Sequence, residues 1–449
     1  MRYLKDNLVV AVTFVAVLCA CQSEQMKPEA LDYTKVELTD SVSVVCYSQM
    51  NSTVNGQPFI PLGIYGVSTD DMSMVKDLGF NLVQSYQFFK MSEEEQKDYM
   101  DTAYENGMMV FAGLDATSDL TEDYVTKMHK TVIRFKNHPA LYAWYLADEP
   151  SIKKTQVEDF QALYDWIKAE DSNHPVINSN WELGNFKNAC DADMRQLYNG
   201  VAHRLTSGLD NYLSKENNGV RTWVAILNAY DSGWEGPGVT VPGINPTSSF
   251  KALTGRGLKD GDVEWEKEEE RWKVLDEHKD NPTSVGFHTT PSFPDTPSKV
   301  RGAFYWAFAH GSNGVYYWLF SNPDKPLNLR WGWYTLFYQP ALRRAVQSTL
   351  REVGELSSYL VNPLRDCTVY KDEKHPGMFV WSKCIDGVRL VIIINETASA
   401  ADATIDLSPL GLTTENLEVF HEDGRVLSLV DGQLKDYFLE DEAHVYWVK

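Results

Sequence analysis

The feature that most constrains the fold is a series of short apolar runs that alternate with segments of helical periodicity. The runs are continuously apolar, as expected for parallel strands that are buried on both faces. Residues 55–66 predict a tight turn and the first buried strand, and we place seven further strands at residues 80–86, 108–114, 141–146, 176–179, 194–198, 223–227 and 315–320. Eight such strands separated by helices over about 260 residues predict an α/β fold, a closed (β/α)8 barrel. An open doubly wound sheet is the alternative, but no strand precedes a Gly-x-Gly-x-x-Gly turn.

The pattern changes near Pro363, where short strands separated by Asp-Gly turns predict an all-β sandwich. A helix at 339–360 joins it to the barrel, and the charged stretch 255–280 is interpreted as a solvated helix in the loop after the seventh strand. The expected sandwich strands are 377–382, 388–395, 401–407, 417–420, 426–430 and 444–448. The predicted domains are a signal peptide (1–20), a tether with a leading strand (21–54), the barrel (55–362) and the sandwich (363–449).

The first residues are typical of an export signal. Arg2 and Lys5 precede an apolar run, 8–20, that is too short to cross a bilayer. The ending Leu18-Cys19-Ala20-Cys21 resembles a bacterial lipobox. That resemblance implies cleavage before Cys21 and lipidation of its thiol, with an ordinary signal peptide as the alternative. We therefore expect a lipid-anchored protein of the Gram-negative envelope, at the outer membrane and facing either the periplasm or the surface.

The amino-acid composition limits the classes of molecule that the protein is expected to bind. The chain has 41 Lys and Arg against 63 Asp and Glu, a net charge of −22, which argues against nucleic acid and against electrostatic docking on anionic lipid. Aromatic residues make up 12% and include 13 Trp, which favours stacking against sugar rings. No cysteine pair has the short spacing of a zinc site, so we expect no metal. Cys367 and Cys384 are expected on adjacent strands, either paired or as free thiols.

The most informative strand end is the fourth, which reads Trp144-Tyr145-Leu146-Ala147-Asp148-Glu149-Pro150. Functional residues of (β/α)8 barrels gather at the carboxyl ends of the strands. Two adjacent acids in a partly dry site favour the neutral form of at least one, and glycosidic cleavage needs a protonated carboxylic acid. The alternative is a surface Asp-Glu-Pro turn that caps the next helix.

Residues 137–150, Asn-His-Pro-Ala-Leu-Tyr-Ala-Trp-Tyr-Leu-Ala-Asp-Glu-Pro, resemble the acid/base region of clan A glycoside hydrolases, which are retaining (β/α)8 barrels. The resemblance implies that Glu149 is the acid/base and that Asp148 stands where the family usually has Asn. Residues 56–63, 191–198 and 311–318 resemble the first, sixth and eighth strand regions of such barrels. In the last of these, Trp318 would be the platform for the sugar. A β-sandwich is a common companion domain.

The seventh strand departs from the family pattern, because Asn228 occupies the position of the usual nucleophilic Glu. An amide cannot form the glycosyl ester, so the second carboxylate would come from Asp231 or Glu235 in the following loop, or less favourably from Glu182. The aromatic residues expected to face a sugar lie at or beyond strand ends. They are Tyr86, Trp181, Tyr198, Trp234 and Trp318, with Tyr65 as a further candidate.

Two functions from different classes follow. The first is a lipid-anchored glycoside hydrolase that needs no cofactor and cleaves O-glycosidic bonds, with retention of configuration. The second is a non-catalytic glycan-binding lipoprotein on a glycosidase-like barrel, which the missing seventh-strand acid favours. A purely structural envelope protein is a third possibility, which the paired acids disfavour.

Overall fold

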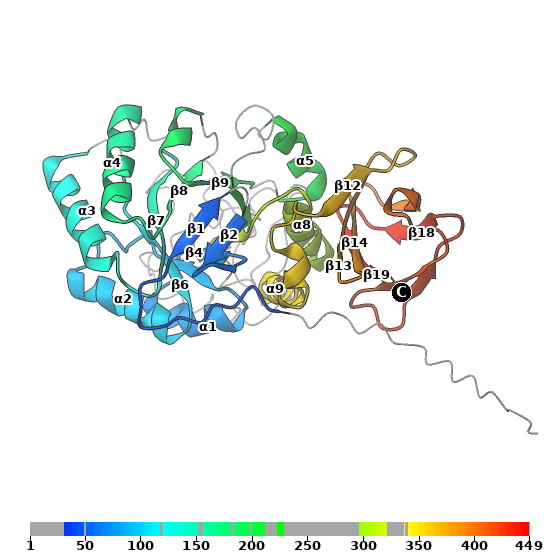
Figure 1. The fold of residues 1–449 in the computed structure, drawn as a ribbon, viewed down its shortest axis with the longest axis horizontal. Helices are drawn as coiled ribbons and strands as arrows, with labels where there is room; N and C mark the ends of the chain where they lie inside the picture. The colour runs from blue at the N-terminus through cyan, green and yellow to red at the C-terminus, as the bar shows by residue number, and fades with distance from the viewer. Residues whose placement is uncertain are drawn as a thin grey trace, which may run out of the picture.

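The computed structural model describes residues 31–48, 51–116, 120–150, 156–180, 184–197, 200–211, 222–228, 296–320, 336 and 340–448. The barrel elements lie on one side of the molecule and the C-terminal sheets on the other, with α8 and α9 between them (Figure 1). The expected helix at 255–280 lies outside these residues, as do the signal peptide and Cys21.

A closed barrel of eight parallel strands confirms the predicted fold class. The strands follow one another around the barrel in chain order, with the last, β11, hydrogen-bonded to the first, β4. They are β4 (Leu62–Tyr65), β5 (Leu82–Gln84), β6 (Met109–Gly113), β7 (Leu141–Asp148), β8 (Val176–Asn180), β9 (Ala192–Gln196), β10 (Trp223–Asn228) and β11 (Val315–Trp318).

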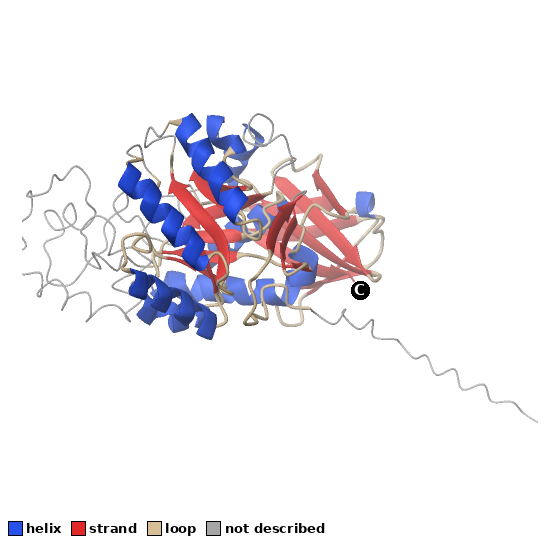
Figure 2. Ribbon diagram, turned by 60° about the vertical axis from the view of Figure 1, so that its left-hand side comes forward, coloured by secondary structure: helices blue, strands red, loops and turns tan. Residues whose placement is uncertain are grey.

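Helices surround the barrel strands (Figure 2). Ser92 and Glu95 form the expected capping box of α2, and the Thr121 side chain caps α3. The helices are α1 (Met72–Asp77), α2 (Glu93–Glu105), α3 (Glu122–Phe135), α4 (Val157–Glu170), α5 (Ala202–Asn211), α8 (Pro297–Ala309) and α9 (Pro340–Leu360), with short 3₁₀ turns η1 (Thr69–Asp71), η2 (Gly184–Asn188) and η5 (Ser408–Leu410). None of the helices in the described residues is both long and apolar enough for a membrane span.

A small antiparallel sheet closes the amino-terminal end of the barrel. It consists of β1 (Val45–Ser48), β2 (Asn51–Val54) and β3 (Gln57–Pro58). The hydroxyls of Tyr47 and Ser52 lie 2.8 and 3.0 Å from the hydroxyl of Tyr142, at the beginning of β7. The turn and the buried strand expected within 55–66 are both present, with β4 as the barrel strand, but the short β3 between them, which belongs to this sheet, was not expected.

The C-terminal residues form two antiparallel sheets, of order β12-β13-β14-β19-β16-β17 and β15-β18. Val380, Ile393, Ile405 and Leu434 are among the apolar residues buried between the two sheets, which confirms the all-β domain. The strands are β12 (Cys367–Lys371), β13 (Met378–Ile385), β14 (Val388–Asn395), β15 (Ala401–Asp406), β16 (Asn416–Val419), β17 (Val426–Ser428), β18 (Gln433–Phe438) and β19 (Ala443–Val448).

Sequence reasoning missed β18, which alternates polar residues with buried ones, and placed Cys367 on a strand without giving the bounds of β12, a largely exposed edge strand. The expected adjacency of Cys367 and Cys384 is correct, but both thiols are free. The residue opposite Cys367 is Lys383. Because neighbouring residues of a strand point to opposite faces of the sheet, Cys384 faces away from Cys367.

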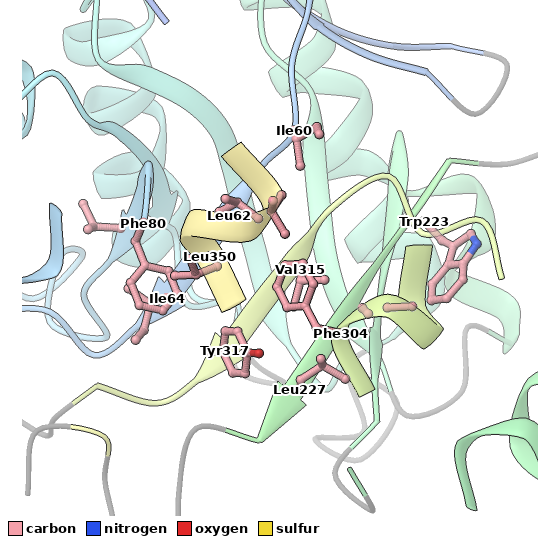
Figure 3. Packing of buried hydrophobic residues seen from close by; sticks show 14 of the residues in the cluster. Ile60, Leu62, Ile64, Phe80, Trp223, Leu227, Phe304, Val315, Tyr317 and Leu350 are labelled. Carbon is pink, nitrogen blue, oxygen red and sulfur yellow. The ribbon is translucent and has the colours of Figure 1, made fainter. Parts of the chain in front are cut away.

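Helix α8 is packed between the barrel and the C-terminal domain. Figure 3 shows Phe304 of α8 beside Val315 and Tyr317 of β11, within one buried apolar cluster. On the other side, a Cβ atom at Gly302 would overlap the carbonyl oxygen of Asp441. His310, at the end of α8, lies 2.6 Å from Glu396. The two domains therefore share one continuous core.

Candidate active site at the carboxyl end of the barrel

A β-bulge near the end of β7 decides which acidic residue faces the barrel axis. Tyr145 belongs to the apolar cluster inside the barrel, whereas Leu146 and Ala147 belong to the cluster between the barrel and its helices. The register with β8 shifts between Tyr145 and Ala147, so that Asp148 is paired with Ser179. Ser179 lies two residues after the inward-facing Ile177 and shares its face. The bulge therefore turns Asp148 inward.

Asp148 is held in this position by a neighbouring phenol. The hydroxyl of Tyr145 donates a hydrogen bond to Asp148 Oδ1 at 2.9 Å. Burial, reinforced by the charge of Asp148, raises the pKa of Tyr145 well above 10, so the phenol stays protonated as a donor. Burial and the same carboxylate also raise the pKa of Tyr65, the last residue of β4. Two neutral tyrosines thus lie beside this acid.

Glu149 follows Asp148 in a left-handed backbone conformation, with φ +52°. Elsewhere in the described residues, positive φ at a residue other than glycine occurs only at Asn, Asp and His, the types that tolerate it best. The Glu149 amide donates a hydrogen bond to the Ser179 carbonyl at 2.9 Å, which ties this conformation to β8. The half-buried Glu149 is thus a strained residue directly after a barrel strand, the kind of position that clusters at active sites.

Aromatic residues at or just beyond the ends of four strands lie beside Asp148. The ring of Tyr65 is stacked on Tyr86, with centroids 5.8 Å apart, and packs edge-on against Tyr145 at 5.7 Å. The indole of Trp318 donates a hydrogen bond to the Tyr86 hydroxyl at 3.0 Å, and the peptide bond after Trp318 is cis. Tyr65, Tyr86 and Trp318, all named from the sequence, are therefore brought together beside Asp148.

Two inward-facing glutamines complete this end of the barrel, and sequence reasoning missed both. Gln84 ends β5 opposite Tyr65, and Gln196 ends β9 opposite the inward-facing Ile226. Gln196 Nε2 donates a hydrogen bond to Ser179 Oγ at 2.7 Å. The alternation of side chains along each strand could have indicated that both glutamines face inward, because each lies two residues after a buried residue of the cluster inside the barrel.

Several predicted residues cannot be assigned a position. Asn228 ends β10 opposite Trp318, so its backbone lies where we expected. The other sugar-facing and second-acid candidates lie outside the described residues: Trp181, Glu182, Tyr198, Asp231, Trp234 and Glu235. The ring of His203, near the beginning of α5, lies 2.9 Å from Asp441 of the C-terminal domain. The described residues contain no group of His, Cys, Asp and Glu arranged to hold a metal.

Comparison with known proteins supports the assignment of the barrel. Residues 75–231 match the family model described as "Glycosyl hydrolases family 2, TIM barrel domain". This segment runs from α1 to just beyond β10 and includes Asp148 and Glu149. The resemblance to glycoside hydrolase barrels, expected from residues 137–150, is confirmed for this segment of the chain.

Among curated proteins, the β-galactosidase of Lactococcus lactis subsp. lactis (strain IL1403) is 31% identical over 140 residues, which are 27% of this chain and 13% of that enzyme. This chain thus matches only a small part of that relative. Among solved structures, AmyP in complex with maltose has a TM-score of 0.50 at 11% identity and covers 86% of this chain and 96% of its own. An α-amylase from Geobacillus thermoleovorans has a TM-score of 0.49 at 11% identity, covering 85% and 91%. At such identity the likeness to AmyP concerns the fold alone.

Proposed function

We propose that this protein is a glycoside hydrolase in which Glu149 is the general acid/base. The observation that carries the proposal is the acid pair at the end of β7, where a bulge turns Asp148 inward and Glu149 is held in a strained conformation. Bulges and strained residues are retained where they direct functional groups. The family match over this segment supports the same reading.

The chemistry follows from two carboxyl groups. Protonated Glu149 donates its proton to the glycosidic oxygen while the bond from that oxygen to the anomeric carbon breaks, and the sugar develops oxocarbenium character. A second carboxylate then forms an ester to the anomeric carbon. Glu149, now ionised, takes a proton from water, and the water oxygen replaces the ester. Two inversions at one carbon give net retention, and no cofactor is required.

The second carboxylate is proposed to be Glu235 or Asp231. Asn228 ends β10 and cannot act as the nucleophile, so the acid has to come from the residues that follow. A retaining pair requires carboxyl groups about 5–5.5 Å apart. Asp148, whose carboxylate accepts a hydrogen bond from Tyr145, is proposed to accept a further hydrogen bond from a substrate hydroxyl.

The place of action is part of the proposal. The lipobox-like Cys21 supports a lipid anchor in a Gram-negative envelope, with a carbohydrate as substrate. Mass spectrometry of the membrane fraction would test it, because a diacylglyceryl group is expected on wild-type Cys21 and on no residue of Cys21→Ser. An unlipidated wild-type protein cut after residue 20 would refute the anchor and leave the barrel chemistry untouched.

The function itself is tested by hydrolysis of aryl glycosides. The purified protein is assayed on p-nitrophenyl β-D-galactoside, β-D-glucoside, β-D-glucuronide and α-D-glucoside. Glu149→Gln is expected to lower kcat/KM on the best substrate by about 10²–10⁴-fold, the usual contribution of general acid–base catalysis. The loss is expected to shrink on the 2,4-dinitrophenyl glycoside, whose leaving group needs no proton. Glu122→Gln, on the exposed first turn of α3, is the matched control and should retain full activity.

The second candidate, a glycan-binding protein without hydrolytic activity, is favoured by Asn228 at the end of β10. Sugar binding without hydrolysis, unchanged in Glu149→Gln, would refute the enzyme and support this alternative. Equal losses on both leaving groups would refute proton donation by Glu149 while leaving hydrolysis intact.

A further inference from the structure

We infer that Gln84 and Gln196 determine the specificity of this site, accepting hydrogen bonds from the hydroxyl groups of an uncharged sugar ring. The inference rests on the proposed function, because it concerns the same end of the barrel. Its starting point is a deficit of hydrogen bonds. Within the described part of the chain, neither Gln84 Oε1 nor Gln196 Oε1 has a hydrogen-bond partner, although both atoms are buried. The two side chains are only 1% and 4% exposed.

Buried polar atoms without partners are uncommon in folded proteins, and each one calls for a reason. Such an atom has lost its hydrogen bonds to water without replacement, so a ligand that supplies a donor restores them. With either orientation of the Gln196 amide, one polar atom bonds Ser179 Oγ and the other is left over. The side-chain oxygen of Gln84 likewise accepts no hydrogen bond from the described residues. The two amides can therefore accept hydrogen bonds from a ligand that carries donor groups.

Both glutamines lie at the same level of the barrel as the acid pair. Gln196 reaches Ser179, and Ser179 is paired with Asp148 across β8 and β7. In the other direction around the barrel, Gln84 is paired with Tyr65. The ring of Tyr65 packs against Tyr145, which donates a hydrogen bond to Asp148. A sugar whose glycosidic oxygen lies at Glu149 would therefore have its hydroxyl groups within this ring of side chains.

The space around Gln84 is made by a glycine. The last residue of β6, Gly113, is paired with the inward-facing Tyr145, so a side chain there would point to the barrel interior. A Cβ atom at Gly113 would already lie 3.5 Å from Gln84 Nε2. A longer side chain on β6 would meet the amide, and glycine leaves this space to Gln84.

The charges that surround the amides indicate the class of sugar. The inward-facing charged group at this level is Asp148, a carboxylate, and Glu149 follows it; the other described members are phenols, an indole, a serine and the two amides. Neutral acceptors beside carboxylates favour hydroxyl donors and repel a uronate. We therefore expect a neutral hexose at this subsite and discrimination against glucuronides.

The experiment is a double-mutant cycle between each glutamine and the hydroxyls of the substrate. Gln84→Met and Gln196→Met keep the length of the side chain and remove its acceptor. They are assayed on the best of the neutral p-nitrophenyl glycosides named above and on its 2-, 3-, 4- and 6-deoxy analogues. Each variant is expected to lose about 10–100-fold in kcat/KM, the size of one lost hydrogen bond in a buried site. For one deoxy analogue, kcat/KM should be at least tenfold lower than for the parent glycoside with the wild-type protein, but less than threefold lower with the matching variant.

Two further readouts separate a specificity role from a structural one. Gln84→Met should melt at or above the wild-type temperature, because it removes a buried oxygen that has no hydrogen-bond partner among the described residues. Gln347→Met on α9, where the half-buried amide donates to the Asp77 carbonyl of α1 rather than facing the barrel interior, is the control and should keep wild-type kcat/KM on every substrate. Equal losses for every deoxy analogue in wild type and variants, or a glucuronide as the best substrate, would overturn the inference while hydrolysis stands.

If wild type hydrolyses none of the glycosides, calorimetric binding of D-galactose, D-glucose and D-glucuronate decides the matter. Binding of a neutral sugar that is weakened at least tenfold in Gln84→Met and Gln196→Met supports this inference although the proposed function has failed. Binding that is unchanged in both variants, or no binding of either neutral sugar by wild type, overturns it.

Discussion

Replacing Glu149 by glycine is expected to stabilise the protein although it removes the proposed catalytic acid. Glu149 has φ +52°, and the left-handed conformation costs a residue with a Cβ atom about 1–2 kcal/mol. Glycine avoids this cost, but its greater freedom in the unfolded chain opposes folding by about 0.5–1 kcal/mol. The net gain lies between about 0 and 1.5 kcal/mol and centres on about 0.75 kcal/mol, which corresponds to about 1–2 °C in the melting temperature of a domain this large.

The comparison that isolates the backbone is between Glu149→Gly and Glu149→Gln, because both lack the carboxylate and only the first relieves the strain. Differential scanning calorimetry of the full chain measures the difference. The same pair at Glu122, in the first turn of the right-handed helix α3, should show the opposite order, since glycine is a poor helix former. A Glu149→Gly protein that melts at or below Glu149→Gln would refute the claim that strain is stored at this residue.

Three further perturbations test the packing and charges outside the site. Gly302→Ala in α8 should destabilise the protein by about 1–3 kcal/mol through overpacking against the C-terminal domain. Gly354→Ala in α9, where an added Cβ atom would lie no closer than 3.6 Å to another atom, should stabilise it by up to about 1 kcal/mol. Urea denaturation measures the free energy of unfolding of both variants. Although burial alone would lower the pKa of His444, hydrogen bonds to two carboxylates raise it. Its contribution is thus complete below about pH 6.5 and is lost as the pH rises through the raised pKa, so the melting temperature of wild type, but not that of His444→Gln, should fall over that range. Cys367 and Cys384 should both react with a thiol reagent in the unfolded, unreduced protein, and an intact mass two protons lower would show a disulfide instead.

Helix and strand positions in the barrel could be predicted from local patterns alone. Continuous apolar runs marked most of the barrel strands, and Ser92 with Glu95 marked the beginning of α2, because burial of both faces and capping leave direct traces in the sequence. The strands β8 and β9 contain polar residues, and β9 begins and ends two residues before the expected range 194–198. The edge strand β12 left none, since its side chains are largely exposed. The acid pair could also be named, because two carboxylates after an apolar strand are unusual.

The direction in which those acids point could not be predicted. Strict alternation from Tyr145 would turn Ala147 and Glu149 inward and Asp148 outward. The bulge between Tyr145 and Ala147 reverses this for Asp148, and the bulge depends on pairing with β8, a strand formed some thirty residues later in the chain. The left-handed φ of Glu149 is likewise held by the distant Ser179 carbonyl.

By itself, then, the sequence determined the barrel, the all-β companion domain and the segment that carries the acids, because hydrophobic periodicity and capping act over a few residues. Only the tertiary structure decided that Asp148 faces inward, that Tyr65, Tyr86 and Trp318 gather beside it, and that the side-chain oxygens of Gln84 and Gln196 are buried there without a hydrogen-bond partner among the described residues. Closure of the barrel brings the ends of eight strands to one place. Which side chains meet there depends on register and bulges, which are properties of paired strands and not of any one of them.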